Sequence, residues 1–168
     1  MDILLLGSGG REHAIAVALK ASPLCDALYV APGNGGTAAI ATNIKLDIND
    51  PAAVADYAAG HGVGLVVIGP EAPLVAGVAD AVRAKGIPAF GPGAQGAQME
   101  GSKRFAKEFM ERHGIPTAAY RSFTEQAGAE AYVAQRFAAD VKVLVVKADG
   151  LAAGKGVVVA TSEQEALG

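Results

Sequence analysis

The sequence contains a single cysteine and no long apolar stretch in its 168 residues. Cys25 cannot form a disulfide within the chain, which favours a reducing compartment. We expect Cys25 to be a small gap-filling side chain near a strand, because no histidine or aspartate pattern surrounds it. No apolar run approaches the roughly 18 residues that a membrane span requires. We therefore expect no membrane partner.

Clusters of basic residues are also missing. The chain has 14 Lys and Arg against 17 Asp and Glu, a net charge of -3, and no Lys or Arg block that could follow a phosphate backbone. This argues against nucleic-acid binding. A strand pattern begins at residue 2, so we expect no signal peptide and a cytoplasmic location.

Apolar residues and glycine, in contrast, are abundant. Hydrophobic residues make up 51% of the chain and its mean hydropathy is +0.30, which is enough for a substantial core. The 22 glycines gather at the ends of apolar runs and form no repeat. Such placement is typical of many tight turns between strands and helices.

The first hundred residues alternate between strand and helix patterns. Short apolar runs bounded by turn residues predict buried strands, and Ala-rich segments between them predict helices. The predicted strands are 3–6, 28–30, 43–46, 65–68 and 89–90, and the predicted helices are 12–20, 51–59 and 74–85. The alternation predicts a Rossmann-like, doubly wound parallel α/β sheet with its ligand at the carboxyl edge of the strands.

The alternation of strand and helix patterns changes between residues 92 and 101, where we place a domain boundary. Residues 1–100 form the first predicted domain, and residues 101–168 begin an α+β domain. Its predicted elements are helices at 103–113 and 125–137, an extended piece at 119–123, strands at 141–147 and 157–161, and a helix starting at 162–165.

The stretch GSGGRE at 7–12 resembles the dinucleotide fingerprint G-x-G-x-x-G, but Glu12 takes the third glycine's place. The second predicted strand also lacks the acidic residue that would hold a ribose, so an NAD or FAD site is disfavoured. A glycine turn at a helix N-terminus can still bind a phosphate through Gly9 and Gly10, with Arg11 as a charged donor. A tight turn with Arg11 in solvent is the alternative.

Further turns follow the other strands, with the sequences APGNGG at 31–36, GPEAPL at 69–74 and FGP at 90–92. All are predicted at one edge of the sheet. The Asn34 amide suits a hydroxyl group, and the Glu71 carboxylate suits an amine. Together these turns predict a pocket for a small phosphorylated, hydroxylated, amine-bearing molecule.

The stretch DGLAAGKGV at 149–157 invites comparison with the Walker A loop but is one residue too short. Gly156 replaces the metal-binding hydroxyl, and a strand follows where a helix is needed. We expect a strand-loop-strand flap whose backbone N–H groups can lie over phosphates. Lys147 ends an apolar run predicted to be buried, so it is a candidate phosphate ligand, as is Lys103. Both lysines could equally be ordinary exposed side chains.

Six segments in order, GSGGREHA, APGNGGT, GPEAPLVAG, FGP, EGSKRFAKEFM and VKADGLAAGKGVVVA, make the chain resemble the phosphoribosylamine-glycine ligase family. This family, also called glycinamide ribonucleotide synthetase, belongs to the ATP-grasp superfamily. The resemblance implies ATP-dependent joining of glycine to phosphoribosylamine in de novo purine synthesis, through glycyl phosphate and with Mg²⁺.

The same resemblance implies the roles of individual residues. Gly9, Gly10 and Arg11 would receive the phosphate of phosphoribosylamine, with Asn34 and Glu71 nearby. The implied ATP site consists of Lys103, Lys147 and the flap residues Gly150, Leu151, Ala152, Ala153, Gly154, Lys155 and Gly156. No metal ligand is expected within this chain.

Members of the family are much longer, so the resemblance implies an N-terminal part that is inactive alone. The rest would supply the adenine site and the Mg²⁺ ligands. A non-catalytic phosphosugar-binding module and, third, a nicotinamide oxidoreductase are the alternatives. We also expect an exposed strand edge in residues 141–161, through which two chains could pair.

Overall fold

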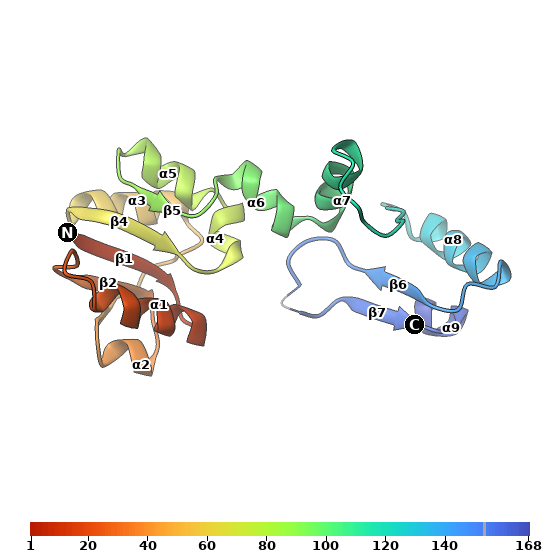
Figure 1. Ribbon diagram of the computed structural model, residues 1–168, viewed down its shortest axis with the longest axis horizontal. Helices are drawn as coiled ribbons and strands as arrows, with labels where there is room; N and C mark the ends of the chain where they lie inside the picture. The colour runs from red at the N-terminus through yellow and green to blue at the C-terminus, as the bar shows by residue number, and fades with distance from the viewer. Residues whose placement is uncertain (153) are drawn as a thin grey trace. The chain divides into compact units, whose positions relative to one another are not determined.

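The computed structural model describes residues 1–152 and 154–168 of the chain. It divides into two compact units, unit 1 at Met1–Gly101 and unit 2 at Ser102–Gly168 (Figure 1). No helix in the described part of the chain is long and apolar enough to cross a membrane. Each unit has its own sheet and is described separately.

Unit 1 is built on a five-stranded parallel sheet with the order β3-β2-β1-β4-β5. The strands are β1 (Asp2–Gly7), β2 (Leu28–Pro32), β3 (Thr42–Asn43), β4 (Val63–Ile68) and β5 (Ala89–Phe90). β1 lies between β2 and β4, so the chain reverses its winding direction there. In such sheets the carboxyl end of the central strands is where ligands bind. The predicted doubly wound α/β sheet is confirmed.

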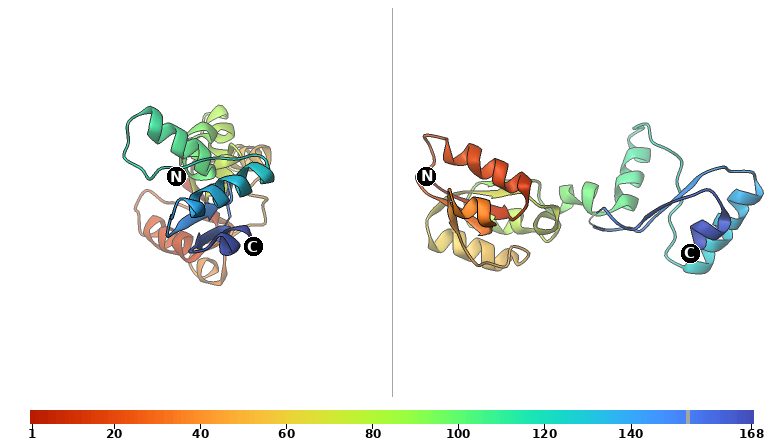
Figure 2. Two further views of the ribbon diagram at one scale, coloured as in Figure 1. Left: turned by 90° about the vertical axis from the view of Figure 1, so that its right-hand side faces the viewer. Right: turned by 90° about the horizontal axis from the view of Figure 1, so that it is seen from below.

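Helices cover both faces of this sheet (Figure 2). α1 (Gly10–Lys20) packs Ala16 against one face, where Leu5 and Val30 are fully buried. α3 (Pro51–Gly60) and α5 (Val78–Ala84) cover the other face. Their alanines and valines meet Leu4, Leu6 and Val66, which are all fully buried. Parallel strands with both faces covered read as continuous apolar runs, which is why the sequence predicted them.

The remaining helices of unit 1 differ from the predictions. One helix was expected at 74–85, but the chain forms α4 (Glu71–Val75) and α5, separated by Gly77 in a left-handed conformation with φ 92°. α2 (Gly35–Ala38) and α6 (Ala94–Gly101) were not predicted, and β3 is shorter than the expected 43–46 strand. Helical propensity is weak where glycines are frequent, so tertiary contacts decide these short elements.

Unit 2 contains α7 (Lys103–Arg112), α8 (Gln126–Ala138), β6 (Leu144–Lys147), β7 (Val157–Ala160) and α9 (Glu163–Leu167). β6 and β7 pair in antiparallel fashion, with Lys147 opposite Val157, so the predicted strand-loop-strand arrangement is confirmed. β6 is shorter than the strand that was expected at 141–147. Its alternating half-buried and exposed residues also contradict the prediction that Lys147 ends a buried run.

Candidate functional site

The loop after β1 lies at the carboxyl edge of the sheet and leads into α1. Gly9 is the N-cap residue of α1, and its N–H donates to Glu12 Oε2 at 2.8 Å. Glu at the third helical position often caps a helix in this way. Among the hydrogen bonds of the described residues, none uses the backbone N–H of Gly10 or Arg11. These two N–H groups at a helix N-terminus can receive an anion.

Arg11 connects this loop to the loop that follows β4. Its Nε donates to Glu12 Oε1 at 2.8 Å, and its Nη1 donates to Glu71 Oε1 at 3.1 Å. Glu71 is the first residue of α4, so Arg11 and Glu71 meet from loops after neighbouring strands. The Arg11 side chain is 56% exposed, which leaves the outer side of its guanidinium accessible.

The charges of these three residues support one another. Hydrogen bonds to Glu12 and then Glu71 raise the pKa of Arg11. Burial opposes ionisation of Glu12, but hydrogen bonds from Arg11 and Gly9 outweigh it and lower the pKa of this carboxyl. The pKa of Glu71 is lowered by its own backbone N–H and by Arg11. The site is therefore a fixed cation between two carboxylates at neutral pH.

Asn34 holds the loop after β2 against the loop after β1. Its Oδ1 accepts the N–H groups of Gly36 and Thr37 at 2.8 and 3.0 Å, which caps α2. Its Nδ2 donates to Ser8 O at 2.8 Å. The side-chain amide that was expected to meet a substrate hydroxyl thus makes structural contacts here, and the direct substrate role stays a prediction.

Thr37 and Asn43 complete this loop and were not singled out from the sequence. The buried Thr37 hydroxyl accepts the Asn34 N–H at 2.8 Å and lies 2.7 Å from Asn43 Oδ1. Asn43 Nδ2 donates to Asn34 O at 2.8 Å. A Thr three positions after an Asn N-cap was a capping pattern in the sequence that could have indicated Thr37.

In unit 2, one predicted lysine contacts the glycine loop. Lys103 Nζ donates to Gly150 O at 2.7 Å. Asp149, which the sequence reasoning did not select, accepts from Ser102 Oγ at 3.0 Å and from Arg104 N at 3.2 Å. Burial opposes ionisation of Asp149, but these hydrogen bonds outweigh it and lower its pKa. Acidic groups are favoured at a helix N-terminus, so Asp149 fixes the loop to the start of α7.

The other residues of the predicted flap lie between β6 and β7. Gly150, Gly154 and Gly156 have positive φ angles of 88°, 76° and 71°. The loop is tied at its base by Ala148 N donating to Gly156 O at 2.8 Å, and Lys155 N donates to Ala152 O at 2.8 Å. Lys147 and Leu151 are exposed. Ala153, also predicted to bind ATP, lies outside the described residues.

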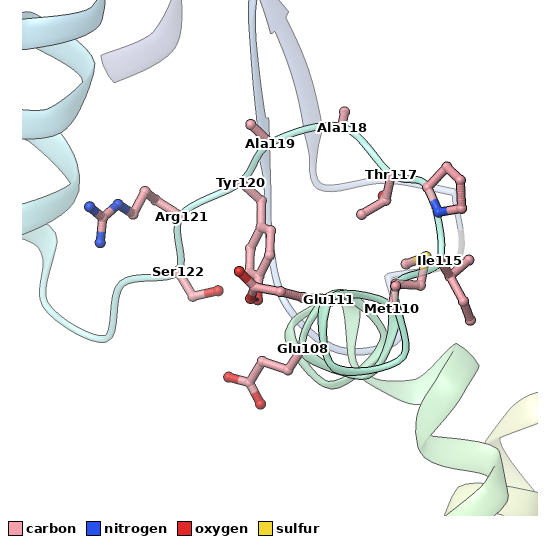
Figure 3. Close-up of a pocket in the computed structure, with 12 residues that line it drawn as sticks. Glu108, Met110, Glu111, Ile115, Thr117, Ala118, Ala119, Tyr120, Arg121 and Ser122 are labelled. Atoms are coloured by element: carbon pink, nitrogen blue, oxygen red, sulfur yellow. Dashed lines mark hydrogen bonds between the residues drawn. The ribbon is translucent and has the colours of Figure 1, made fainter.

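A recess of about 860 Å³ lies elsewhere in unit 2, between α7 and the segment 114–122 (Figure 3). Tyr120 stands over α7, and its hydroxyl donates to Glu111 Oε2 at 3.0 Å. The recess contains none of the residues predicted to bind ATP or the sugar phosphate. In the part of the chain that the structure describes, no group of three or more His, Cys, Asp or Glu residues could hold a metal ion.

The chain is an ATP-grasp protein by class. It combines a doubly wound sheet, which has a glycine loop after its first strand, with a partial ATP-grasp domain. The profile described as "Phosphoribosylglycinamide synthetase, N domain" matches residues 1–100, and that family's "ATP-grasp (A) domain" matches residues 101–168. The chain therefore belongs to the phosphoribosylglycinamide synthetase family.

Individual relatives agree with this family. The chain is 52% identical over 168 residues to phosphoribosylamine–glycine ligase of Yersinia pestis, covering 99% of this chain and 38% of that protein. It is 55% identical over 167 residues to the ligase of Agrobacterium fabrum, with the same coverage. The chain thus spans about 38% of the length of these curated relatives.

Solved structures support the family and the fold. The crystal structure of phosphoribosylamine–glycine ligase from Thermotoga maritima matches with a TM-score of 0.75 and 30% identity, over 99% of this chain and 38% of that one. An ADP complex of N5-carboxyaminoimidazole ribonucleotide synthetase matches with a TM-score of 0.72 and 20% identity, over 98% and 42%. The second likeness concerns the fold alone.

Proposed function

We propose that the chain is the N-terminal part of an ATP-dependent carbon-nitrogen ligase that joins glycine to 5-phosphoribosylamine. The products are glycinamide ribonucleotide, ADP and phosphate, in de novo purine synthesis in the cytoplasm. The observation that carries this proposal is the ordered match of two domains of one family along the whole chain. Because the chain spans about 38% of its relatives' length, we expect no activity from it alone.

In this proposal unit 1 is the substrate domain. The N–H groups of Gly10 and Arg11 and the Arg11 guanidinium receive the phosphate of phosphoribosylamine, with Gly9 shaping the turn. Glu71 accepts a hydrogen bond from the amine or a hydroxyl group, since its side chain is 44% exposed and a carboxylate can accept several such bonds. Asn34 keeps the neighbouring loop in place.

Unit 2 is the start of the ATP-grasp domain. Lys103, Lys147 and the loop from Gly150 to Gly156 suit the phosphates of ATP, because they combine two cations with glycine backbone that a phosphate can approach closely. Mg²⁺ would neutralise the charge of those phosphates. The described residues offer no cluster of metal ligands, so we assign these ligands to the part of the relatives' length that this chain does not span.

A chimera tests the ligase proposal. The chain is joined to the remaining part of the Yersinia pestis ligase, and phosphate release is measured with ATP, Mg²⁺, glycine and phosphoribosylamine. We expect release that requires all three substrates and falls at least tenfold in Lys147→Ala. Lys142→Ala, an exposed lysine of the same segment, should retain activity. A folded chimera that hydrolyses no ATP would contradict the proposal.

A non-catalytic phosphosugar-binding module is the second candidate, because the Arg11 site lies entirely within unit 1. Calorimetry of the 168-residue chain with ribose 5-phosphate tests it. Heat of binding should disappear in Arg11→Ala and persist in Arg121→Ala, which removes an exposed arginine of unit 2. No binding by the unchanged chain would exclude this candidate.

A further inference from the structure

We propose that Glu12 is a positioning residue that orients Arg11 for the phosphoryl group of the ligand; this inference rests on the proposed phosphosugar site of unit 1. Glu12 belongs to none of the residues that the resemblance implied. It is nonetheless one of two polar side chains in the buried part of the described chain, with 4% of its surface exposed. A buried carboxylate beside an anion site requires a reason, because burial and like charge both oppose it.

Glycines from the ends of two strands surround this carboxylate. A Cβ atom at Gly7 would overlap Glu12 Cγ, one at Gly9 would lie 2.8 Å from Glu12 Oε2, and one at Gly69 would lie 2.5 Å from Glu12 Oε1. Gly7 ends β1 and Gly69 follows β4, the two central strands at the reversal point of the sheet. The Glu12 side chain therefore fills a space that only glycines leave open, at the position where the dinucleotide fingerprint has the glycine that lets helix and strand pack closely.

The two oxygens of Glu12 have different partners. Oε2 accepts the Gly9 N–H at 2.8 Å, which removes that donor from any ligand. Oε1 accepts Arg11 Nε at 2.8 Å, which fixes the inner edge of the guanidinium. The N–H groups of Gly10 and Arg11 and the outer edge of the guanidinium stay available, and this set matches the oxygens of one phosphoryl group.

With 4% of its surface exposed and both oxygens hydrogen-bonded, the Glu12 carboxylate is closed to a ligand and acts through Arg11. It orients the guanidinium towards the phosphoryl group while its own charge stays covered by the loop.

Glu12→Gln separates this role from simple helix capping. The substitution removes a negative charge beside an anion site, so electrostatics alone predicts tighter binding of ribose 5-phosphate. The positioning role predicts the opposite, a roughly tenfold weaker Kd, because the charged contact that orients Arg11 is lost. Glu100→Gln, an exposed glutamate of unit 1, is the charge-matched control and should leave the Kd unchanged.

A double-mutant cycle with Arg11 shows whether Glu12 acts through it. In an Arg11→Lys chain, which keeps a cation for the phosphate but lacks the Nε donor to Glu12, Glu12→Gln should change the affinity less than twofold. Tighter or unchanged binding by Glu12→Gln, or an equal loss in both backgrounds, would overturn the inference while leaving the proposed site intact. If the unchanged chain binds no ribose 5-phosphate, the proposed site and this inference fail together.

If Glu12→Gln does not fold, amide exchange of the unchanged chain tests whether Glu12 holds the loop after β1. The Gly9 N–H should be protected both without and with ribose 5-phosphate, since Glu12 holds it throughout. The N–H groups of Gly10 and Arg11 should gain protection only with the ligand. Protection of Gly9 that appears only on ligand binding would contradict the role of Glu12.

Discussion

At the scale of single residues, unit 1 uses polar side chains mainly to fix its loops. The Asn34 side-chain amide bonds the backbone of two loops, and the two Glu12 oxygens accept from the Gly9 N–H and from Arg11 Nε. Arg11 is the exposed side chain of this group, and we propose that it reaches the ligand. Substitutions among the loop-fixing residues should consequently affect stability as well as binding.

The lowered pKa of Glu12 makes the stability of unit 1 depend on pH. Its pKa in the folded chain lies below the unfolded value of about 4.3, so ionised Glu12 stabilises the fold above that pH. This contribution disappears as pH falls through the folded pKa. Compared with the unchanged chain, Glu12→Gln should lower the free energy of unfolding by about 1.5–3 kcal/mol at pH 7.

The same difference should shrink towards pH 3, as measured by denaturant titration at each pH. Glu100→Gln, which removes an exposed charge from the same unit, should show no such trend. A Glu12→Gln effect that is equal at pH 7 and pH 3 would mean that the ionised carboxylate is not what stabilises the loop.

Thr37 offers a second test at this scale. Thr37→Val keeps the side-chain shape but leaves the Asn34 N–H and Asn43 Oδ1 without their hydroxyl partner inside the protein. An unsatisfied buried polar group costs about 1–3 kcal/mol, so thermal and denaturant unfolding should show a loss of that size. Thr42→Val, at a neighbouring exposed threonine, should change stability by less than about 0.5 kcal/mol.

At the scale of elements, the sequence predicted the central strands best. β1, β2 and β4 are short apolar runs between turn residues, and burial on both faces makes such runs unambiguous. The division of residues 74–85 into two helices was missed, because Gly77 adopts a left-handed conformation that propensity alone does not reveal. α6 was also missed. Its glycines weaken the helical pattern in the sequence, and tertiary contacts stabilise the helix nevertheless.

The candidate site could also be predicted in part from the sequence. The strand order places the loops after β1 and β4 together, so Arg11 and Glu71 could be assigned to one edge of the sheet. Glu12 was treated only as a missing glycine. Its role depends on three glycines that approach one side chain from the ends of β1 and β4, and spacing along the chain does not contain that information.

Gly77 gives the test at the scale of elements. A Cβ atom there would meet only Ala94 Cβ, at 3.9 Å, so an added methyl group causes no clash. The left-handed backbone should nevertheless cost Gly77→Ala about 1–2 kcal/mol in the free energy of unfolding. Gly60→Ala, at the end of α3 with nothing near its Cβ position, should be neutral or slightly stabilising. Equal effects at both positions would show that the backbone conformation is not the cause.

At the scale of the whole molecule, the two units differ in how well they cover their sheets. The sheet of unit 1 has helices on both faces, whereas β6 and β7 carry exposed valines. Val145, Val157, Val158 and Val159 are all more than 40% exposed. Exposed apolar strands with open edges promote pairing with other strands. Association of two chains through this sheet stays a prediction.

Val159→Lys tests that association. Val159 is 63% exposed, so lysine there should leave the fold intact and weaken any pairing of strands. Sedimentation velocity at increasing concentration should show association of the unchanged chain and at least fivefold weaker association of Val159→Lys. Val17→Lys, the same change at an exposed position of α1, should have no effect. A chain that stays monomeric at all concentrations would refute the expectation.

The contact between Lys103 and Gly150 has a further consequence for ATP. The lysine proposed to bind phosphate already donates to the loop proposed to cover that phosphate. An ammonium group has three N–H donors, so Lys103 can keep this carbonyl and still donate to a phosphate. The bound nucleotide and the docked loop would then share one side chain, and a substitution that weakens the docked state should lower the apparent ATP affinity without touching the nucleotide.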